Sequence, residues 1–122
     1  MTHFNEIERF RYAERLMDQK DALGCLMMLE PLLGEHADDQ GIQLLTARAY
    51  FHSAQLGRAA TALTALLEQN PSDHYARFLL GRTLERANKP QEALPHLRLA
   101  AAMNPDPDYT ESVTRLEQKL AS

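Results

Sequence analysis

The pattern of small and apolar residues in this chain repeats every 34 residues, and no insertion is needed to keep the register. Two sets of small residues mark it: Ala13, Ala47 and Gly81 in one place, and Cys25, Ala59 and Ala93 in another. A unit of this length holds two helices and cannot bury its apolar face alone, so successive copies must stack. The chain is therefore predicted to contain three helix–turn–helix copies, at about residues 6–39, 40–73 and 74–107.

The third copy shows how the two helices of a unit pair. Gly81 lies in the middle of an apolar helical face, where a glycine costs about 1 kcal/mol relative to alanine and so needs a packing reason. Ala93, on the second helix, offers a small partner. We therefore expect the helix backbones to approach closely at Gly81 and Ala93, and likewise at Ala47 and Ala59 in the second copy.

Start and stop signals predict the helix boundaries. The first helix is expected over 2–19 with Thr2 as its cap, and the second over 21–33, irregular near Pro31 and stopped by Gly34. The third is expected over 40–53 with Asp38 or Asp39 as its cap, and the fourth over 58–69 after a turn at 55–57. Residues 88–90 separate the fifth and sixth helices, and Pro95 should bend the sixth slightly.

A seventh helix is expected over about 107–121, after Asp106 and Pro107. Its apolar stripe consists of Val113, Leu116 and Leu120. Because a stack of repeats ends with an apolar face that needs cover, this helix is predicted to be a cap. The alternative is that it exchanges between two chains.

Charge is distributed unevenly along the chain. The net charge is −4, which argues against general nucleic-acid binding. Residues 1–40 carry nine acids and four bases, whereas residues 74–105 carry five bases and two acids. The first repeat is thus acidic and the third basic, which indicates either a role in recognition or merely uneven surface solvation.

Cysteine content and hydropathy bear on the compartment. A single cysteine, Cys25, allows no internal disulfide and fits a reducing compartment. Its register with alanines predicts a small buried hydrophobe, and a reactive thiol is the alternative. The charged N-terminus is unlike a signal peptide, and no apolar run approaches the length of a membrane span. We expect a cytoplasmic protein without a membrane partner.

No constellation of residues indicates catalysis. The five histidines have no helical metal-ligand spacing, and no Cys-x-x-Cys pair occurs. Ser72, Asp73 and His74 include the residue types of a triad, but their adjacency favours a helix cap. The sequence therefore predicts no enzyme, no cofactor and no metal site.

The 34-residue unit resembles the tetratricopeptide repeat over roughly residues 6–105. The residues that match the family pattern are Leu80, Gly81, Tyr50, Ala59, Ala93, Ala100, Pro71 and Pro105. Leucines replace the usual phenylalanine, Arg9, Gln43 and Arg77 stand at the tryptophan position, and Thr46 takes a place that is usually apolar. The resemblance implies an all-α, right-handed α-solenoid of three repeats plus the C-terminal capping helix.

The resemblance also implies a concave groove lined by the first helix of each repeat. Placed on this chain, the groove residues are Phe10, Glu14, Leu44, Arg48, Phe51, His52, Tyr75, Phe78, Arg82 and Arg86. Phe10, Leu44 and Phe78 would form one stripe, and Glu14, Arg48 and Arg82 a second. The alternative for the aromatic residues is ordinary packing between repeats.

Some members of the family hold chaperone C-termini with a basic carboxylate clamp. The corresponding places here hold Phe10, Glu14, Leu45, Tyr75 and Leu79, so that clamp is absent. The expected function is a non-catalytic scaffold that binds a peptide or helix of a partner protein with apolar anchors and an acidic group. The alternative is a self-associating structural subunit, a homo-oligomer formed through the groove or the capping helix.

Overall fold

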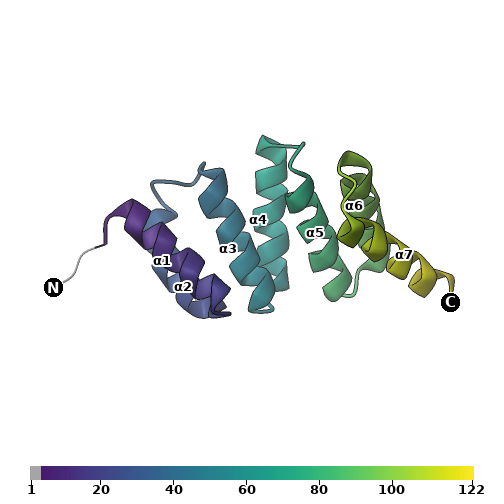
Figure 1. The fold of residues 1–122 in the computed structure, drawn as a ribbon, viewed down its shortest axis with the longest axis horizontal. Coiled ribbons are helices and arrows are strands. Elements are labelled where there is room, and N and C mark those ends of the chain that lie inside the picture. The colour runs from purple at the N-terminus through teal and green to yellow at the C-terminus, as the bar shows by residue number, and fades with distance from the viewer. Residues whose placement is uncertain (1–3) are drawn as a thin grey trace. The chain divides into compact units, whose positions relative to one another are not determined.

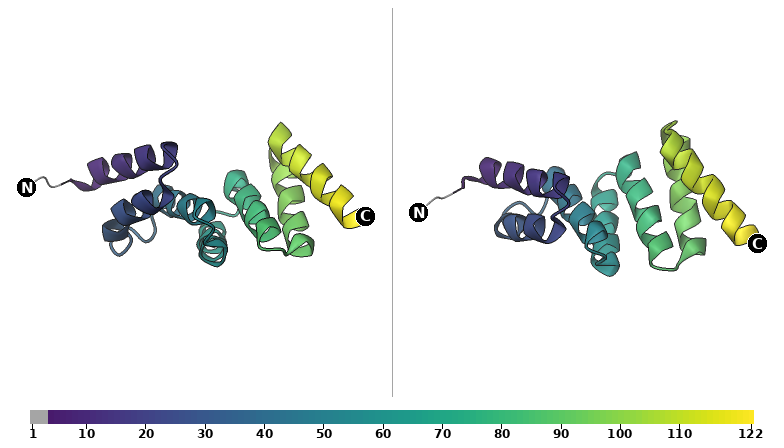
Figure 2. Two further views of the ribbon diagram at one scale, coloured as in Figure 1. Left: turned by 90° about the horizontal axis from the view of Figure 1, so that it is seen from below. Right: turned by 60° about the horizontal axis from the view of Figure 1, so that its bottom comes forward.

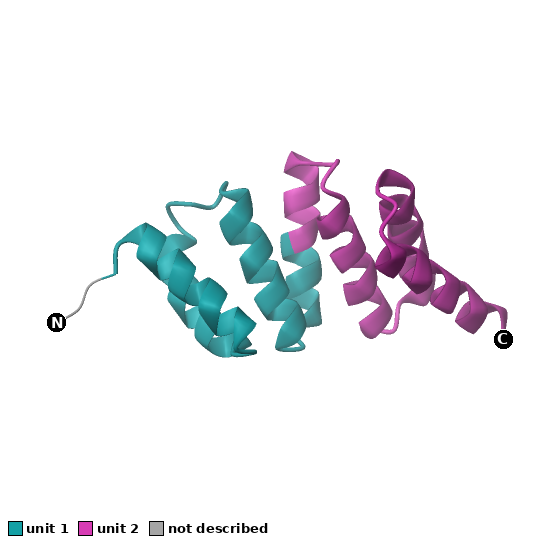
Figure 3. Cartoon of the chain, in the orientation of Figure 1, with its two compact units in different colours: residues 1–62 teal, residues 63–122 magenta. Residues whose placement is uncertain are grey.

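The computed structural model describes residues 4–122, and these residues form helices and no strand. The helices are α1 (Glu6–Asp18), α2 (Ala22–Leu29), the 3-10 helix η1 (Glu30–Leu32), α3 (Gln40–His52), α4 (Leu56–Gln69), α5 (His74–Arg86), α6 (Pro90–Met103) and α7 (Pro107–Ala121), shown in Figure 1. They form two compact units, residues 1–62 and 63–122, which divide within α4 (Figure 3). Among residues 4–122, no helix combines the length and the hydropathy that a membrane span requires.

Aspartates begin the helices where the sequence predicted them. The Asp39 carboxylate accepts a 3.0 Å hydrogen bond from the Ile42 backbone N–H, and Asp73 accepts one of 3.0 Å from Ala76. Each bond satisfies one of the four N–H groups that a helix start leaves without an intrahelical partner. Caps 34 residues apart therefore begin the first helix of the second and third repeats.

Two helix starts differ from the prediction. The expected cap Thr2 lies outside the described residues, and α1 instead begins at Glu6, where the Asn5 side chain accepts from Glu8 at 2.8 Å. The fourth helix begins at Leu56 and not at Arg58, so Gly57 is a helical residue and not part of a turn. The reason is that the chain reverses earlier, at Ala54.

The turn inside each repeat uses a left-handed residue that is not glycine. Lys20, Ala54 and Asn88 have φ angles of 65°, 60° and 63° and lie 34 residues apart. After each, a backbone N–H reaches back five residues, as from Gln55 to the Tyr50 carbonyl at 2.8 Å. This is the Schellman arrangement that satisfies the last carbonyls of a helix. It recurs in all three repeats.

The second helix of the first repeat ends irregularly, as Pro31 predicted. It continues as the 3-10 helix η1 with Pro31 near its start. The helical segment ends at Leu32 with Leu33 as its cap, so Gly34 is the first residue beyond it, as predicted, although its φ is not positive. In the third repeat, Pro95 lies inside α6, where it removes one backbone donor.

At the position where the tetratricopeptide pattern has tryptophan, this chain has polar side chains that donate hydrogen bonds to backbone carbonyls. Arg9 donates to the Met28 carbonyl at 3.4 Å, Gln43 donates to the Ala37 carbonyl, and Arg77 donates to the Pro71 carbonyl at 3.4 Å. Each bond joins the first helix of a repeat to its own second helix or to the preceding connector. These residues thus tie elements together by hydrogen bonds where a ring would do so by burial.

The core of the first unit is formed by α1, α2, η1 and α3. Ala13, Cys25 and Leu29 have no exposed surface, and Phe10 packs against this cluster while partly buried. Thr46, the polar residue at an apolar position, is also buried, and its hydroxyl donates to the Ile42 carbonyl at 2.7 Å. The hydroxyl is therefore satisfied within its own helix.

The second unit packs α6 between α5 and α7. Figure 2 shows α6 and α7 side by side from two directions. Leu116 of α7 is fully buried with Ala93 and Leu97 of α6, and Val113 and Leu120 pack against this cluster. The predicted apolar stripe of the seventh helix therefore covers the third repeat of its own chain.

Gly81 makes the close helix crossing that the sequence predicted. A Cβ atom on Gly81 would lie 2.6 Å from Leu97 Cδ2 and 3.3 Å from the Ala93 carbonyl oxygen. The Leu97 side chain thus occupies the space that any larger residue would need. Ala47 and Ala59 are also fully buried, as expected for a small-to-small crossing in the second repeat.

Gly81→Ala should lower the free energy of unfolding by about 1–3 kcal/mol, because Leu97 must move to admit the methyl group. Gly57→Ala is the matched control, since Gly57 is helical and has no atom within 4 Å of an added Cβ. It should raise stability by about 0.5–1 kcal/mol. Urea denaturation of both variants measures the two effects, and equal stability would contradict the crossing.

Leu116→Ala should lower the free energy of unfolding by about 2–5 kcal/mol, because it opens a cavity in the α6–α7 core. Leu99→Ala on α6 is the control, since that side chain is 44% exposed. Its effect should stay within about 0.5 kcal/mol. A Leu116→Ala chain as stable as the control would mean that α7 does not cap the third repeat.

Candidate binding site

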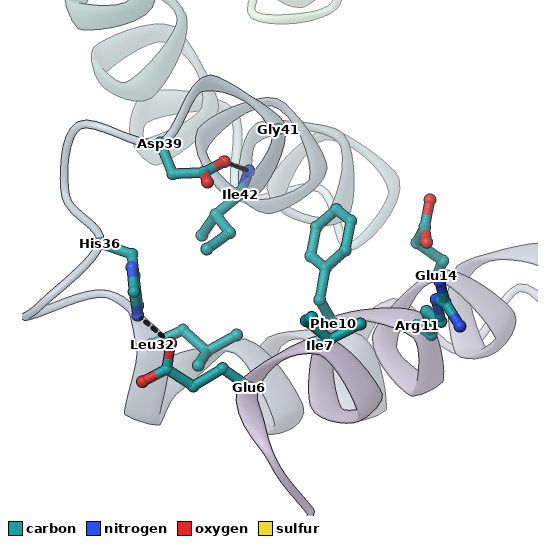
Figure 4. A pocket seen from close by; sticks show the side chains of 10 residues that line it. All are labelled: Glu6, Ile7, Phe10, Arg11, Glu14, Leu32, His36, Asp39, Gly41 and Ile42. Atoms are coloured by element: carbon teal, nitrogen blue, oxygen red, sulfur yellow. Dashed lines mark hydrogen bonds and ion pairs between the residues drawn. The ribbon is translucent and has the colours of Figure 1, made fainter.

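A pocket of about 390 Å³ opens in the first unit between α1, the end of η1 and the start of α3 (Figure 4). From α1 the lining residues are Glu6, Ile7, Phe10, Arg11 and Glu14. The remaining lining residues are Leu32, His36, Asp39, Gly41 and Ile42. Two predicted groove residues, Phe10 and Glu14, therefore line one hollow.

The floor of the pocket is apolar, and most of its charged groups are acidic. The Phe10 ring points toward the start of α3, where a Cβ on Gly41 would lie 3.8 Å from the ring. Ile7 is 64% exposed, which leaves apolar area at the edge of the pocket. Glu6 forms an ion pair of 2.5 Å with His36 Nε2. The pocket therefore offers a ring-sized apolar surface beside carboxylates.

A tyrosine fills the corresponding region of the second unit. Tyr109 of α7 is 3% exposed and stacks on Phe78 with ring centroids 4.5 Å apart and an interplanar angle of 25°. Its hydroxyl oxygen and His74 Nδ1 are 2.9 Å apart and share a hydrogen bond. Burial, with a smaller contribution from Asp106, raises the pKa of Tyr109, so the phenol stays protonated. Phe78 therefore belongs to the packing between α5 and α7.

The predicted residues of α3 lie on its partly buried and exposed faces. Leu44 and Arg48 are half-buried, and the Arg48 Nε atom is buried without a hydrogen-bond partner among the described residues. Phe51 and His52 contact each other edge to face, with ring centroids 5.3 Å apart. These side chains lie on the same unit as the pocket but do not line it.

One of the predicted residues of α5, Arg82, lies beside Glu85. The guanidinium carbon of Arg82 lies 6.0 Å from the centre of the Phe78 ring, and its Nε lies 3.6 Å from Glu85 Oε1. Arg115 of α7 donates to the same carboxylate at 2.7 Å. Tyr75 and Arg86 are exposed. Two arginines thus share one acid, which leaves a net positive group on this face.

One group of metal-type ligands occurs among the described residues. The ligand atoms of Glu6, Glu35 and His36 lie within 4.8 Å of one another, beside the pocket. Two of the three residues are exposed, and Glu6 and His36 are already paired. The arrangement explains how His36 is held at the rim of the pocket.

Cys25 has the surroundings of a structural residue. Its side chain has no exposed surface, and burial raises the pKa of its thiol to about 11, against a smaller opposing effect of Arg48. A thiol with this pKa is almost entirely protonated near neutral pH and is therefore a poor nucleophile.

Cys25 should resist alkylation by iodoacetamide at pH 8 while the chain is folded, because the thiolate is scarce below a pKa of about 11 and the sulfur is covered. In denaturing urea the thiol should react at the rate of a free cysteine. Mass spectrometry of the alkylated chain measures both rates. Rapid labelling of the folded chain would favour the reactive-thiol alternative.

Three residues that shape these regions were not predicted. Tyr109 was missed because the apolar stripe of α7 was taken from Val113, Leu116 and Leu120. Gly41 and His36 were missed because neither belongs to an apolar pattern. The available signal was the 34-residue register, which places Gly41, Tyr75 and Tyr109 at one position.

Comparison with known proteins identifies the repeat. The family model described as Tetratricopeptide repeat matches residues 44–107. A search of curated proteins gives no significant match. The comparison with solved structures instead shows which folds are similar.

Three solved structures illustrate the similarity in fold. The first tetratricopeptide repeat domain of Spaghetti (RPAP3), bound to the HSP90 peptide SRMEEVD, is 16% identical with a TM-score of 0.86, and the match covers 95% of both chains. MamA MSR-1 is 17% identical with a TM-score of 0.82, over 98% of this chain and 69% of that one. YrrB, described as having an unusual peptide-binding site, is 18% identical with a TM-score of 0.83, over 93% and 58%.

Proposed function

The chain belongs to the tetratricopeptide repeat family, and from this premise we propose that it is a non-catalytic scaffold that binds a peptide or helix of a partner protein. The observation that carries the proposal is the open pocket of about 390 Å³ beside Phe10 and Glu14, two of the predicted groove residues. Two proteins with a similar fold are described as binding peptides. A reducing compartment, and hence the cytoplasm, suits a chain with one buried thiol.

Phe10 and Ile7 would supply the apolar anchor site of the first unit. Both lie on α1 at the pocket, and Ile7 remains largely exposed. An apolar side chain of the partner that entered this pocket would remove their surfaces from water. Burial of a large apolar side chain stabilises a complex by about 1.5–3 kcal/mol before the entropy of association is counted.

Arg82 of α5 would recognise an acidic group of the partner. The Arg82 side chain is 36% exposed and lies against Phe78, which limits its freedom before binding. Arginine suits this role because its planar fork pairs with carboxylates in two bonds.

Arg82→Ala should weaken binding of the partner captured from a native cell extract by about 1 kcal/mol or more, because a charge-assisted contact is lost. Arg58→Ala is the matched control, since that arginine is exposed and donates to Gln55 at 2.7 Å on the same chain. Calorimetry at two salt concentrations measures the affinities. The Arg82 effect should shrink as salt rises. Equal affinities of the two variants would remove α5 from the binding site.

A second candidate function is self-association, which one surface of α2 favours. Leu23 and Met27, one turn apart, are 62% and 73% exposed. The equivalent positions in the other repeats hold Gly57 and Thr61, and Gln91 and Pro95, which offer little apolar surface. Sedimentation equilibrium separates the candidates: a dimer lost on Met27→Glu supports self-association, and a monomer at all concentrations excludes it.

A further inference from the structure

The pocket of the first unit corresponds, residue by residue, to the place that Tyr109 fills in the second unit. Counting two repeat lengths along the chain, Phe10 corresponds to Phe78, Glu6 to His74 and Gly41 to Tyr109. The two environments agree in geometry as well as in register. The Tyr109 ring stacks on Phe78 at 4.5 Å, and a Cβ on Gly41 would point at the Phe10 ring from 3.8 Å.

The pocket is therefore open because Gly41 carries no side chain. In the second unit, one tyrosine supplies a stacked ring and a hydroxyl bonded to His74 at 2.9 Å. In the first unit, Phe10 lines the pocket, and Glu6, which takes the place of His74 in the repeat register, lies 2.5 Å from His36 Nε2 at the same pocket (Figure 4). The site thus keeps the phenylalanine ring, has a carboxylate in place of the His74 imidazole, and lacks the tyrosine itself.

We propose that this pocket binds a tyrosine side chain of a partner protein, stacked on Phe10 with its hydroxyl bonded to the Glu6–His36 pair. The inference rests on the proposed scaffold function and names the anchor that it recognises. A second unit of the same chain provides the template, since Phe78, Tyr109 and His74 form this arrangement within one fold.

The charge around the pocket indicates which residues of the partner would flank its tyrosine. Glu6, Glu14 and Asp39 line it with carboxylates, against the single guanidinium of Arg11. The Asp39 carboxylate also caps α3 by accepting a hydrogen bond from the Ile42 backbone N–H. Basic residues on either side of the tyrosine would therefore meet a complementary field, and acidic ones a repulsive field.

The experiment uses the full chain and three short peptides as probes: acetyl-Arg-Tyr-Arg-amide, acetyl-Arg-Ala-Arg-amide and acetyl-Glu-Tyr-Glu-amide. Titration followed by NMR should show saturable shifts of Phe10 and Ile42 with the first peptide. Each of the other two should bind at least about tenfold more weakly at low salt, because the ring or the favourable charge is missing. Equal binding of all three, or shifts confined to other residues, would overturn the inference.

Gly41→Tyr is the decisive variant, because it supplies the missing ring from within the chain. The fold accommodates a tyrosine at this position of a repeat. Tyr75 lies two residues after the capping Asp73, just as position 41 lies two residues after the capping Asp39. The variant should melt no lower than wild type and should bind acetyl-Arg-Tyr-Arg-amide at least about tenfold more weakly. Gly41→Ala, which adds a Cβ without a ring, should bind as wild type does.

Glu6→Gln provides a second readout that does not depend on filling the pocket. It keeps the shape of the side chain but removes the charge beside the expected hydroxyl. Wild type should bind p-cresol, which has the tyrosine hydroxyl, more tightly than toluene, which lacks it. In Glu6→Gln this ratio of affinities should fall several-fold. Undiminished peptide binding by a folded Gly41→Tyr chain would overturn the inference. The inference would also be overturned if the chain formed a dimer that Gly41→Tyr converted to a monomer. In that case the tyrosine in the pocket would come from a second copy of the chain and not from a partner protein.

The two proposals fail separately. If the chain captures a partner from extract and Gly41→Tyr leaves that affinity unchanged, the tyrosine pocket is wrong while the scaffold function stands. If the tyrosine peptide binds as described but no protein partner is captured, the pocket stands and the scaffold function is contradicted.

Discussion

The close crossing of two helices within each repeat is the contact on which the other features depend. It requires a small residue on both helices, and Ala13 with Cys25 and Gly81 with Ala93 meet this requirement as buried pairs. Gly81 shows how little room remains, since Leu97 already occupies the position of a missing Cβ. Because the crossing uses one face of the first helix, a neighbouring face is left to line a pocket in one unit and to meet α7 in the other.

Much of the fold was predictable because its signals are local or periodic. Asp39 and Asp73 cap helices by a rule that needs only the adjacent residues, and Pro31 disturbs its own helix. The left-handed backbone of Lys20, Ala54 and Asn88 was not predicted, because this conformation is normally signalled by glycine. For the same reason Gly57 was taken for a turn residue, although it lies within α4.

The candidate site was harder to predict, because whether a groove residue is available depends on its neighbours in space. Phe10 and Phe78 are equivalent in sequence, but one lines an open pocket while the other stacks on Tyr109. What separates them is the residue one repeat further on, a glycine in one case and a tyrosine in the other. A pattern read along a single helix contains no information about this difference.

The left-handed residues in the turn between the two helices of each repeat affect how the chain unfolds. Lys20, Ala54 and Asn88 are all exposed, and each holds a backbone conformation that costs an ordinary residue about 1 kcal/mol or more. A glycine at any one of them would relieve strain in a single repeat without altering a packed surface. The molecule thus contains three equivalent positions at which the intrinsic free energy of one repeat can be separated from the coupling between neighbours.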